Sequence, residues 1–225
     1  MEPTTQLYMR YSALDPRALT CDTTVLTVDR DVEGRTYVVL RETTVHPQGG
    51  GQLADDALIG AARVVDARRE RDTGRILHFI DGPTPSVGDV VRVVVKEETR
   101  LRNAALHSAG HLLALLADRY VTGVTIRAGH HYPNEARVAG PCTTSPDLAS
   151  VTPLLQEHAE EAIRQAWPIT SVFLATRREI AVGDGKPEGC GGTHLAHCGL
   201  LRDLKVLKVN HQKGELRIRY TVLGA

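Results

Sequence analysis

Hydrophobic and polar positions follow two different patterns along this chain. Up to about residue 97, short stretches rich in Val, Ile and Thr alternate with turn sequences that contain Gly, Pro and Asp, as in a series of short β-strands. The stretches are TVLTVDR, RTYVVLRETTV, ALIGAARVVDA, RILHFID and DVVRVVVKEE. Short strands at this spacing predict a small β-barrel or sandwich.

After Glu98 the apolar residues recur at helical spacing. LRNAALHSAGHLLALLADRY, residues 101–120, carries a leucine- and alanine-rich stripe and predicts a helix. A second helix is expected from Pro153 to Trp167, with Thr152 as its N-cap.

The tail LKVLKVNHQKGELRIRYTV predicts a β-hairpin that turns at residues 212–215. The fold is therefore expected to be α+β. A β-barrel domain that includes the glycine-rich GGGQ loop is predicted at 1–97, and a second domain of helices and strands at 98–225.

Composition narrows the class of protein. The 225 residues are 42% hydrophobic and 24% charged, as in ordinary globular domains. The formal net charge is zero, so contact with nucleic acid would need a local basic patch. No apolar run is long enough to cross a bilayer, the first residues do not resemble a secretion signal, and the four cysteines are scattered. We therefore expect a cytoplasmic protein that does not enter a membrane.

Two histidines on the first predicted helix are candidate metal ligands. His107 and His111 are four residues apart, which places both imidazoles on one helical face. The same spacing also occurs by chance on solvated faces. Ser108 follows His107 where a zinc protease would have Glu, so the protease signature is absent.

A second candidate segment is EGCGGTHLAHCG, residues 188–199. Its glycines favour a turn that brings Cys190 and His194 to one point, and thiolate and imidazole are favoured zinc ligands. Cys190 and Cys198 are too far apart in sequence for a redox C-x-x-C pair. Two alternatives are a self-contained knuckle that adds His197 and Cys198, and a glycine-rich turn around a buried free cysteine.

Taken together, these motifs resemble a known family. H-x-x-x-H on a helix followed much later by CGGTH, together with HPQGGGQLAD at residues 46–55, closely resembles the editing domain of alanyl-tRNA synthetases and the related AlaX-type editing proteins. LRNAALHSAGHLL is similar to the family's histidine helix, and KVLKVNHQKGELRIRY to its closing hairpin. The resemblance implies a β-barrel joined to an α/β editing domain of the type shared by alanyl- and threonyl-tRNA synthetases.

The resemblance also implies an activity and a cofactor. One zinc ion would be held by His107, His111, Cys190 and His194, and the protein would hydrolyse the ester of mischarged tRNA, either seryl- or glycyl-tRNA(Ala). The chain is too short for an aminoacylation module, so editing in trans is expected.

Alternatives remain open at this stage. Relatives of the family clear a threonine-like or noncanonical acyl group such as fluorothreonine. A zinc-stabilised tRNA-binding module without catalysis is the rival from another class. The chain departs from the family at Val45-His46-Pro47 and at Leu195 to Cys198, and His130 and His131 either line the cleft or lie on a loop.

Roles for further residues follow from the same resemblance. Gly50, Gly51 and Gln52 fall where the family's loop overhangs the editing site. Gln52, Thr44 and Thr193 are polar groups suited to bonding a substrate hydroxyl. Thr193, with a nearby backbone N–H, is also a candidate for steering the attacking water, and a turn hydroxyl that bonds its own backbone is the alternative.

Basic residues suggest where tRNA would bind. They enter the histidine helix or lie in the closing hairpin, and the alternative is a merely solvated hairpin face. No DNA partner is expected, and the protein is predicted to be a monomer or a homodimer. The basic residues are Arg100 and Arg102 at the helix, and Lys205, Lys208, Arg217 and Arg219 in the hairpin.

Overall fold

The computed structural model describes residues 2–174 and 177–222. The chain divides into two compact units: one comprises Met1–Gly49 and Leu53–Leu101, the other Gly50–Gln52 and Arg102–Ala225. The tip of the glycine-rich loop thus belongs with the second unit. Within the described ranges, no helix combines the length and apolar character that crossing a membrane requires.

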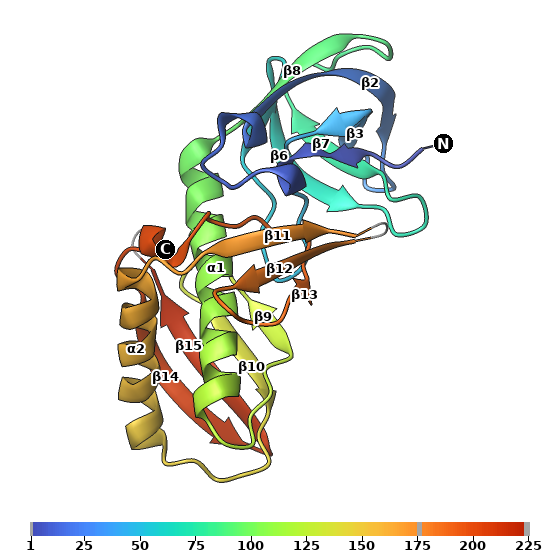
Figure 1. Ribbon diagram of the computed structural model, residues 1–225. Coiled ribbons are helices and arrows are strands. Elements are labelled where there is room, and N and C mark those ends of the chain that lie inside the picture. Colours follow the sequence, from blue (N-terminus) through green and yellow to red (C-terminus); the bar gives the residue numbers. More distant parts are fainter. Residues whose placement is uncertain (1, 175–176, 223–225) are drawn as a thin grey trace. The chain divides into compact units, whose positions relative to one another are not determined.

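The first unit is a closed six-stranded barrel, which confirms the predicted fold (Figure 1). Its core is made of apolar side chains from the strands, and Val38, Leu40, Ile76 and Val93 are completely buried there. ALIGAARVVDA forms two strands and not one, because Gly60 turns the chain with a φ of 59°. In barrel order the strands are β2 (Thr20–Arg30), β3 (Thr36–Leu40), β7 (Ile76–Asp81), β6 (Ala62–Arg69), β5 (Ala57–Ile59) and β8 (Val90–Val95).

Short elements complete this unit. Parallel strands β1 (Thr5–Gln6) and β4 (Glu42–Thr43) pair outside the barrel. Two 3-10 helices, η1 (Leu7–Arg10) and η2 (Pro16–Ala18), lie between β1 and β2 in the sequence.

A buried ion pair lies within the first unit. Arg100 is completely buried, pairs with the buried carboxylate of Asp55, and donates to the backbone carbonyl oxygens of Ala18 (2.8 Å) and Thr44 (2.6 Å). The prediction that Arg100 contacts tRNA is therefore wrong, because its guanidinium is enclosed by the protein.

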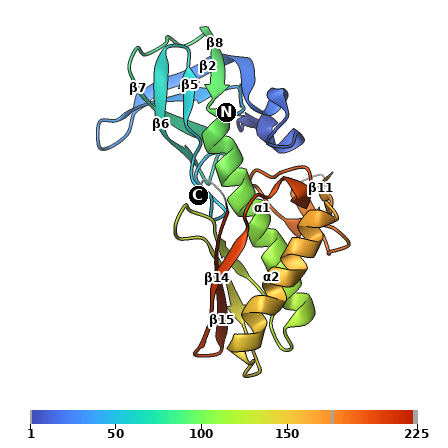
Figure 2. The ribbon, with the colours of Figure 1, turned by 90° about the vertical axis from the view of Figure 1, so that its left-hand side faces the viewer.

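The second unit packs helices against a four-stranded antiparallel sheet in the order β14-β15-β10-β9. Helix α2 (Leu148–Arg164) lies against β14 (Lys205–Gln212), as Figure 2 shows. The other sheet strands are β15 (Glu215–Thr221), β10 (Arg137–Pro141) and β9 (Ala128–His130). A smaller sheet contains β11 (Ile169–Phe173), β12 (Arg178–Val182) and β13 (Glu188–Gly189), and a 3-10 helix, η3 (Cys198–Leu200), follows it in the sequence.

The first helix and the hairpin were predicted correctly. Helix α1 spans Glu97–Tyr120 and carries the two histidines. In the hairpin, Gln212 pairs with Glu215, and Lys213 and Gly214 turn the chain with φ values of 53° and 73°. Two consecutive residues with positive φ make the tight turn that joins twisted strands.

The predicted start of the second helix is wrong. Helix α2 begins at Leu148, and its N-cap is Asp147, whose carboxylate accepts a 3.1 Å hydrogen bond from the Ala149 N–H. Pro153 lies inside the helix, where one backbone hydrogen bond is lost. The helix ends at Arg164, because Ala166 has a φ of 50° that breaks the helical path.

Candidate metal centre

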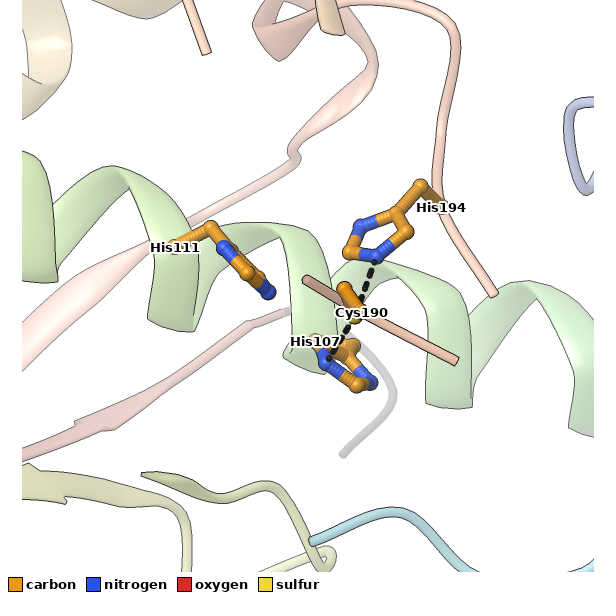
Figure 3. Close-up of side chains that lie close together, drawn as sticks. All are labelled: His107, His111, Cys190 and His194. Carbon is orange, nitrogen blue, oxygen red and sulfur yellow. Dashed lines mark hydrogen bonds between the residues drawn. The ribbon is translucent and has the colours of Figure 1, made fainter. Parts of the chain in front are cut away.

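Four side chains from distant parts of the sequence converge in the second unit. His107 and His111 project from one face of α1, while Cys190 and His194 come from the turn that follows β13 (Figure 3). Their nitrogen and sulfur atoms all lie within 4.8 Å of one another. The sulfur of Cys190 is 3.4 Å from Nε2 of His107 and 3.2 Å from Nε2 of His194.

The two distances from the Cys190 sulfur, 3.4 and 3.2 Å, are close to those around a tetrahedral metal ion. With nitrogen ligands at ~2.0–2.1 Å and sulfur at ~2.3 Å from zinc, neighbouring ligand atoms lie roughly 3.3–3.8 Å apart. Three imidazoles and one thiol form a donor set that zinc favours. The residues therefore fit a single ion held by four protein ligands.

The Gln52 side chain orients the first ligand. Its Oε1 accepts a 2.8 Å hydrogen bond from Nδ1 of His107, which leaves Nε2 of that ring unprotonated and directed at Cys190. The same oxygen accepts from the Thr193 N–H at 3.0 Å, and the amide NH₂ donates to the Thr193 hydroxyl at 2.9 Å. Gln52 thus connects the loop tip to both halves of the centre.

Ser108 supports the second half of the centre. Its hydroxyl oxygen accepts a 3.1 Å hydrogen bond from the Leu195 N–H and lies 3.4 Å from Nδ1 of His194. A proton on that Nδ1 leaves Nε2 of His194 free to face the ion. This role was not predicted, because in the sequence Ser108 is only a small hydroxyl residue one position after His107.

The glycines of CGGTH are needed for close approach. A Cβ atom on Gly192 would lie 2.1 Å from Cε1 of His107, so no larger residue fits. Arg178 holds the turn by donating to the carbonyl oxygens of Cys190 (3.0 Å) and Gly192. The turn is thereby fixed against the histidine helix.

Burial controls the charge of the ligands. It lowers the pKa of His111 to about 4, aided by the positive charge of Arg178, so this imidazole is neutral at pH 7, as metal binding requires. Burial also raises the pKa of the Cys190 thiol. A bound cation would counter that effect by stabilising the thiolate.

A cavity of about 530 Å³ opens beside the centre. Its wall includes three of the four candidate ligands, His107, His111 and Cys190. Apolar side chains form another part of the wall, and backbone of the glycine-rich loop and of β9 closes it. The remaining lining residues are Gly50, Gly51, Gly110, Ala114, Ile126, Arg127, Ala128, Gly129, His131, Val138, Glu188, Gly189 and Gly191.

Comparison with known proteins places the chain among relatives of one enzyme. No protein-family model matches it. It is 33% identical over 220 residues to the alanine–tRNA ligase of Caldivirga maquilingensis, and 30% identical to those of Sulfurisphaera tokodaii and Methanospirillum hungatei. The chain is homologous to alanine–tRNA ligases. The predicted recognition is confirmed.

The similarity is confined to a segment of these ligases. It covers 82% of this chain and 24% of the Caldivirga protein, so the chain spans about a quarter of the length of the curated relatives it matches. The candidate metal centre and the glycine-rich loop belong to this homologue of part of an alanine–tRNA ligase.

The structure distinguishes among the predicted substrate contacts of this alanine–tRNA ligase homologue. Gly50 and Gly51 line the cavity. Gln52 is completely buried and bonded to His107 and Thr193, and its contact with substrate stays a prediction. Thr44 is buried in the first unit, where its carbonyl binds Arg100, and it does not line the cavity.

The same network includes Thr193. Both its N–H and its hydroxyl are bonded to Gln52, and the residue is 2% exposed. Its N–H is therefore already bonded within the protein, while its hydroxyl oxygen only accepts from Gln52, and its catalytic role stays a prediction. Glu188, which sequence analysis did not single out, is the one carboxylate among the described residues that line the cavity.

The segment after CGGTH lies outside the centre. Cys198 is completely buried, and burial raises its pKa to about 12. Within the described ranges, the cluster that could hold a metal includes neither Cys198 nor His197. The self-contained knuckle is therefore not the arrangement of this homologue.

Basic residues of the hairpin share one exposed face of the second unit. Lys208 on β14 pairs in register with Arg219 on β15, which pairs with Arg137 on β10. Lys205 is also exposed, while Arg217 forms an exposed ion pair with Glu215. The predicted Arg102 is only partly exposed, and its Nε is buried.

Proposed function

We propose that the protein hydrolyses the ester bond of mischarged tRNA, with seryl- or glycyl-tRNA(Ala) as substrate. The observation that carries this proposal is the convergence of His107, His111, Cys190 and His194 at the wall of a cavity that Gly50 and Gly51 also line. Homology to alanine–tRNA ligases supports tRNA as the partner.

Zinc is the metal we propose for the centre. When bound by the four ligands, the ion would place positive charge at the cavity wall and favour the thiolate of Cys190. Four protein ligands make a closed site, which suits a role in ordering the site. Gln52 and Ser108 would hold His107 and His194 in the orientation that such an ion needs.

Other groups of the chain would handle the ester. The cavity would receive the acyl group, and the backbone of Gly50 and Gly51 in its wall would allow close approach of the terminal ribose. Glu188 lines the cavity and would accept a proton from the attacking water. Because an aminoacyl ester is intrinsically labile, these groups need supply only part of a large rate acceleration.

The role of Glu188 is testable by one substitution. Glu188→Gln keeps the shape and removes the base, so we expect kcat to fall by about 100-fold, the lower range for general-base catalysis, with little change in KM. A rise in KM with unchanged kcat would contradict this role and place the carboxylate in substrate binding.

The central experiment measures deacylation of a panel of charged tRNAs. The panel contains seryl-, glycyl-, alanyl-, threonyl- and fluorothreonyl-tRNA, each timed against spontaneous hydrolysis. We expect accelerated loss of the seryl or glycyl ester. Preference for the threonine-type esters would reassign the substrate, and no acceleration of any ester by zinc-loaded protein would refute the proposal.

The metal assignment is tested with a pair of cysteine variants. Cys190→Ala should lower the zinc content and the activity together. Cys198→Ala removes a buried thiol eight positions along the same segment, outside the cluster, and should keep its zinc. Full zinc occupancy in Cys190→Ala would contradict the four-ligand site.

A further inference from the structure

His131 is a fourth histidine at the candidate metal centre, beside the three among the candidate ligands, and the cluster that could hold a metal does not include it. It follows β9, is buried, and its ring stacks on His107 with centroids 4.3 Å apart. A Cβ atom on Gly110 would lie 2.4 Å from Cε1 of this ring, and one on Gly129 would lie 2.4 Å from Nε2. The imidazole fits at this position because Gly110 and Gly129 lack side chains.

The hydrogen bonds of His131 define its tautomer. Tyr220 donates its only hydroxyl proton to the carbonyl oxygen of Leu106 at 3.0 Å. The hydroxyl oxygen lies 2.6 Å from Nδ1 of His131, so it must accept a proton from that nitrogen. The neutral ring therefore carries its lone pair on Nε2.

A backbone contact fixes the main chain of His131. The His131 N–H donates to the Gly51 carbonyl oxygen at 2.7 Å, so the residue is tied to the tip of the glycine-rich loop. Gly51 itself has a φ of 75°, and a Cβ atom there would lie 2.3 Å from the carbonyl oxygen of Gly129. Loop tip and β9 thus fix the position of the imidazole.

Nε2 of His131 is the acceptor that remains available. It has no hydrogen-bond partner among the described residues, and it is not one of the fully buried polar atoms without partners. His131 lines the cavity, and so does Gly129, on which a Cβ atom would lie 2.4 Å from Nε2. An acceptor that reaches a cavity whose wall also carries the apolar side chains of Ala114, Ile126 and Val138 suits a ligand hydroxyl.

We propose that Nε2 of His131 accepts a hydrogen bond from the β-hydroxyl of the acyl group, and so selects β-hydroxy aminoacyl esters over alanyl ones. This proposal rests on the proposed function, because it places the acyl group in the same cavity. An alanyl group has no donor for Nε2 and leaves that polar atom unpaired. Preference for a hydroxyl of this kind is stronger than apolar fit alone provides.

The test measures binding without turnover. Adenosine that carries a seryl group through a stable 3′-amide link, and its alanyl counterpart, are titrated against the zinc-loaded protein. We expect the seryl amide to bind about tenfold more tightly, as one hydrogen bond to a neutral acceptor allows. Equal affinities would overturn the proposal.

Two substitutions of His131 separate its two nitrogens. His131→Asn can still donate to Tyr220 but has no acceptor at the position of Nε2, so the preference should disappear while alanyl-amide affinity and zinc content stay unchanged. His131→Gln places an amide oxygen near Nε2 and should restore part of the preference. Equal weakening of both amides would mean that Nε2 contacts the ribose or the ammonium, and would overturn the assignment.

Two further variants control the interpretation. His130→Asn changes the neighbouring, partly exposed histidine, which pairs with Glu135 and does not line the cavity, so it should keep the preference. Tyr220→Phe removes the hydroxyl that defines the tautomer and should reduce the seryl preference. An unchanged preference in Tyr220→Phe would contradict the tautomer argument.

The outcome for His131 is separable from that for catalysis. In one outcome the wild type prefers the seryl amide, His131→Asn does not, and the wild type hydrolyses no ester. That result would refute the proposed function and support the hydroxyl contact. Hydrolysis of an ester without any preference that depends on His131 would support the proposed function and refute the hydroxyl contact. Melting temperatures of all variants establish that each comparison is made on folded protein.

Discussion

Gln52 shows at the scale of one residue how a loop and a metal centre are connected. Its amide accepts from Nδ1 of His107 and from the Thr193 N–H, and donates to the Thr193 hydroxyl. Replacing the amide would leave the His107 tautomer unspecified and two buried groups of Thr193 unpaired. Partners of this kind commonly change metal affinity by 10- to 100-fold.

We therefore predict that Gln52→Ala lowers zinc affinity by about 10- to 100-fold. The measurement is competition with a chelator of known affinity. Gln48→Ala is the matched control, because Gln48 is exposed on the same loop, and it should bind zinc like the wild type. Unchanged zinc affinity in Gln52→Ala would show that the metal ligands do not need the Gln52 amide to be correctly oriented.

The chemistry of this site was predictable from sequence, but its connections were not. Spacing places His107 and His111 on one helical face, while the full set of four ligands was implied by the resemblance of the motifs to the editing-domain family. The role of Gln52 depends on partners 55 and 141 positions away. The resemblance of its loop to the family's and its polarity suggested a substrate contact, and only the fold shows its bonds to His107 and Thr193.

A second residue, His78, makes the barrel sensitive to acid. It is completely buried, contacts the Thr43 hydroxyl at 3.0 Å and the Val38 carbonyl oxygen at 3.2 Å, and burial lowers its pKa from 6.5 to about 4. The unfolded chain therefore binds this proton at a pH where the folded chain does not. Stability must fall as the pH drops from about 6.5 towards 4.

We predict a loss of up to about 3 kcal/mol from this residue over that pH range, since each pKa unit corresponds to about 1.4 kcal/mol. Denaturant unfolding at pH 7 and at pH 4 measures it. His78→Gln removes the titrating group and should show a smaller pH dependence, whatever its stability at pH 7. The partly exposed His158→Gln should behave as the wild type; identical pH dependence in all three would refute the prediction.

At the scale of elements, the sequence predicted a turn correctly where the residue types in it favour one backbone conformation. Lys213-Gly214 supports two positive φ angles, so the closing turn could be placed correctly. The start of α2 could not, because Thr152-Pro153 and Asp147 are both reasonable start signals. The choice depends on whether residues 148–152 gain by packing, and Val151 is buried in the second unit.

The N-cap of α2 can be tested directly. Asp147→Ala removes the carboxylate that accepts from the Ala149 N–H and should lower the free energy of unfolding by about 1 kcal/mol. Thr152→Ala removes only a hydroxyl that bonds the Leu148 carbonyl oxygen at 3.4 Å, so a change within about 0.5 kcal/mol is expected. Thermal or denaturant unfolding measures both variants. A larger loss of unfolding free energy in Thr152→Ala than in Asp147→Ala would support Thr152 as the N-cap.

For the whole molecule, the net charge is zero, but the basic residues are not evenly distributed. The chain has 27 basic and 27 acidic residues, so no overall field attracts a polyanion such as tRNA. The second unit nevertheless presents Lys208, Arg219 and Arg137 side by side across three strands. Phosphate contacts at such a row would dominate the affinity and make it depend on salt.

We predict that this row contributes to tRNA binding as separate phosphate contacts. Lys208→Ala and Arg219→Ala should each reduce the slope of log affinity against log salt by roughly 0.7–0.9, the value for one phosphate contact. Arg164→Ala is the control, because Arg164 ends α2 and forms an exposed ion pair with Glu161, so its slope should stay unchanged. Binding isotherms of tRNA at several salt concentrations give these slopes. If both hairpin variants keep the wild-type slope, tRNA binds elsewhere on the molecule, and the hairpin face is simply solvated.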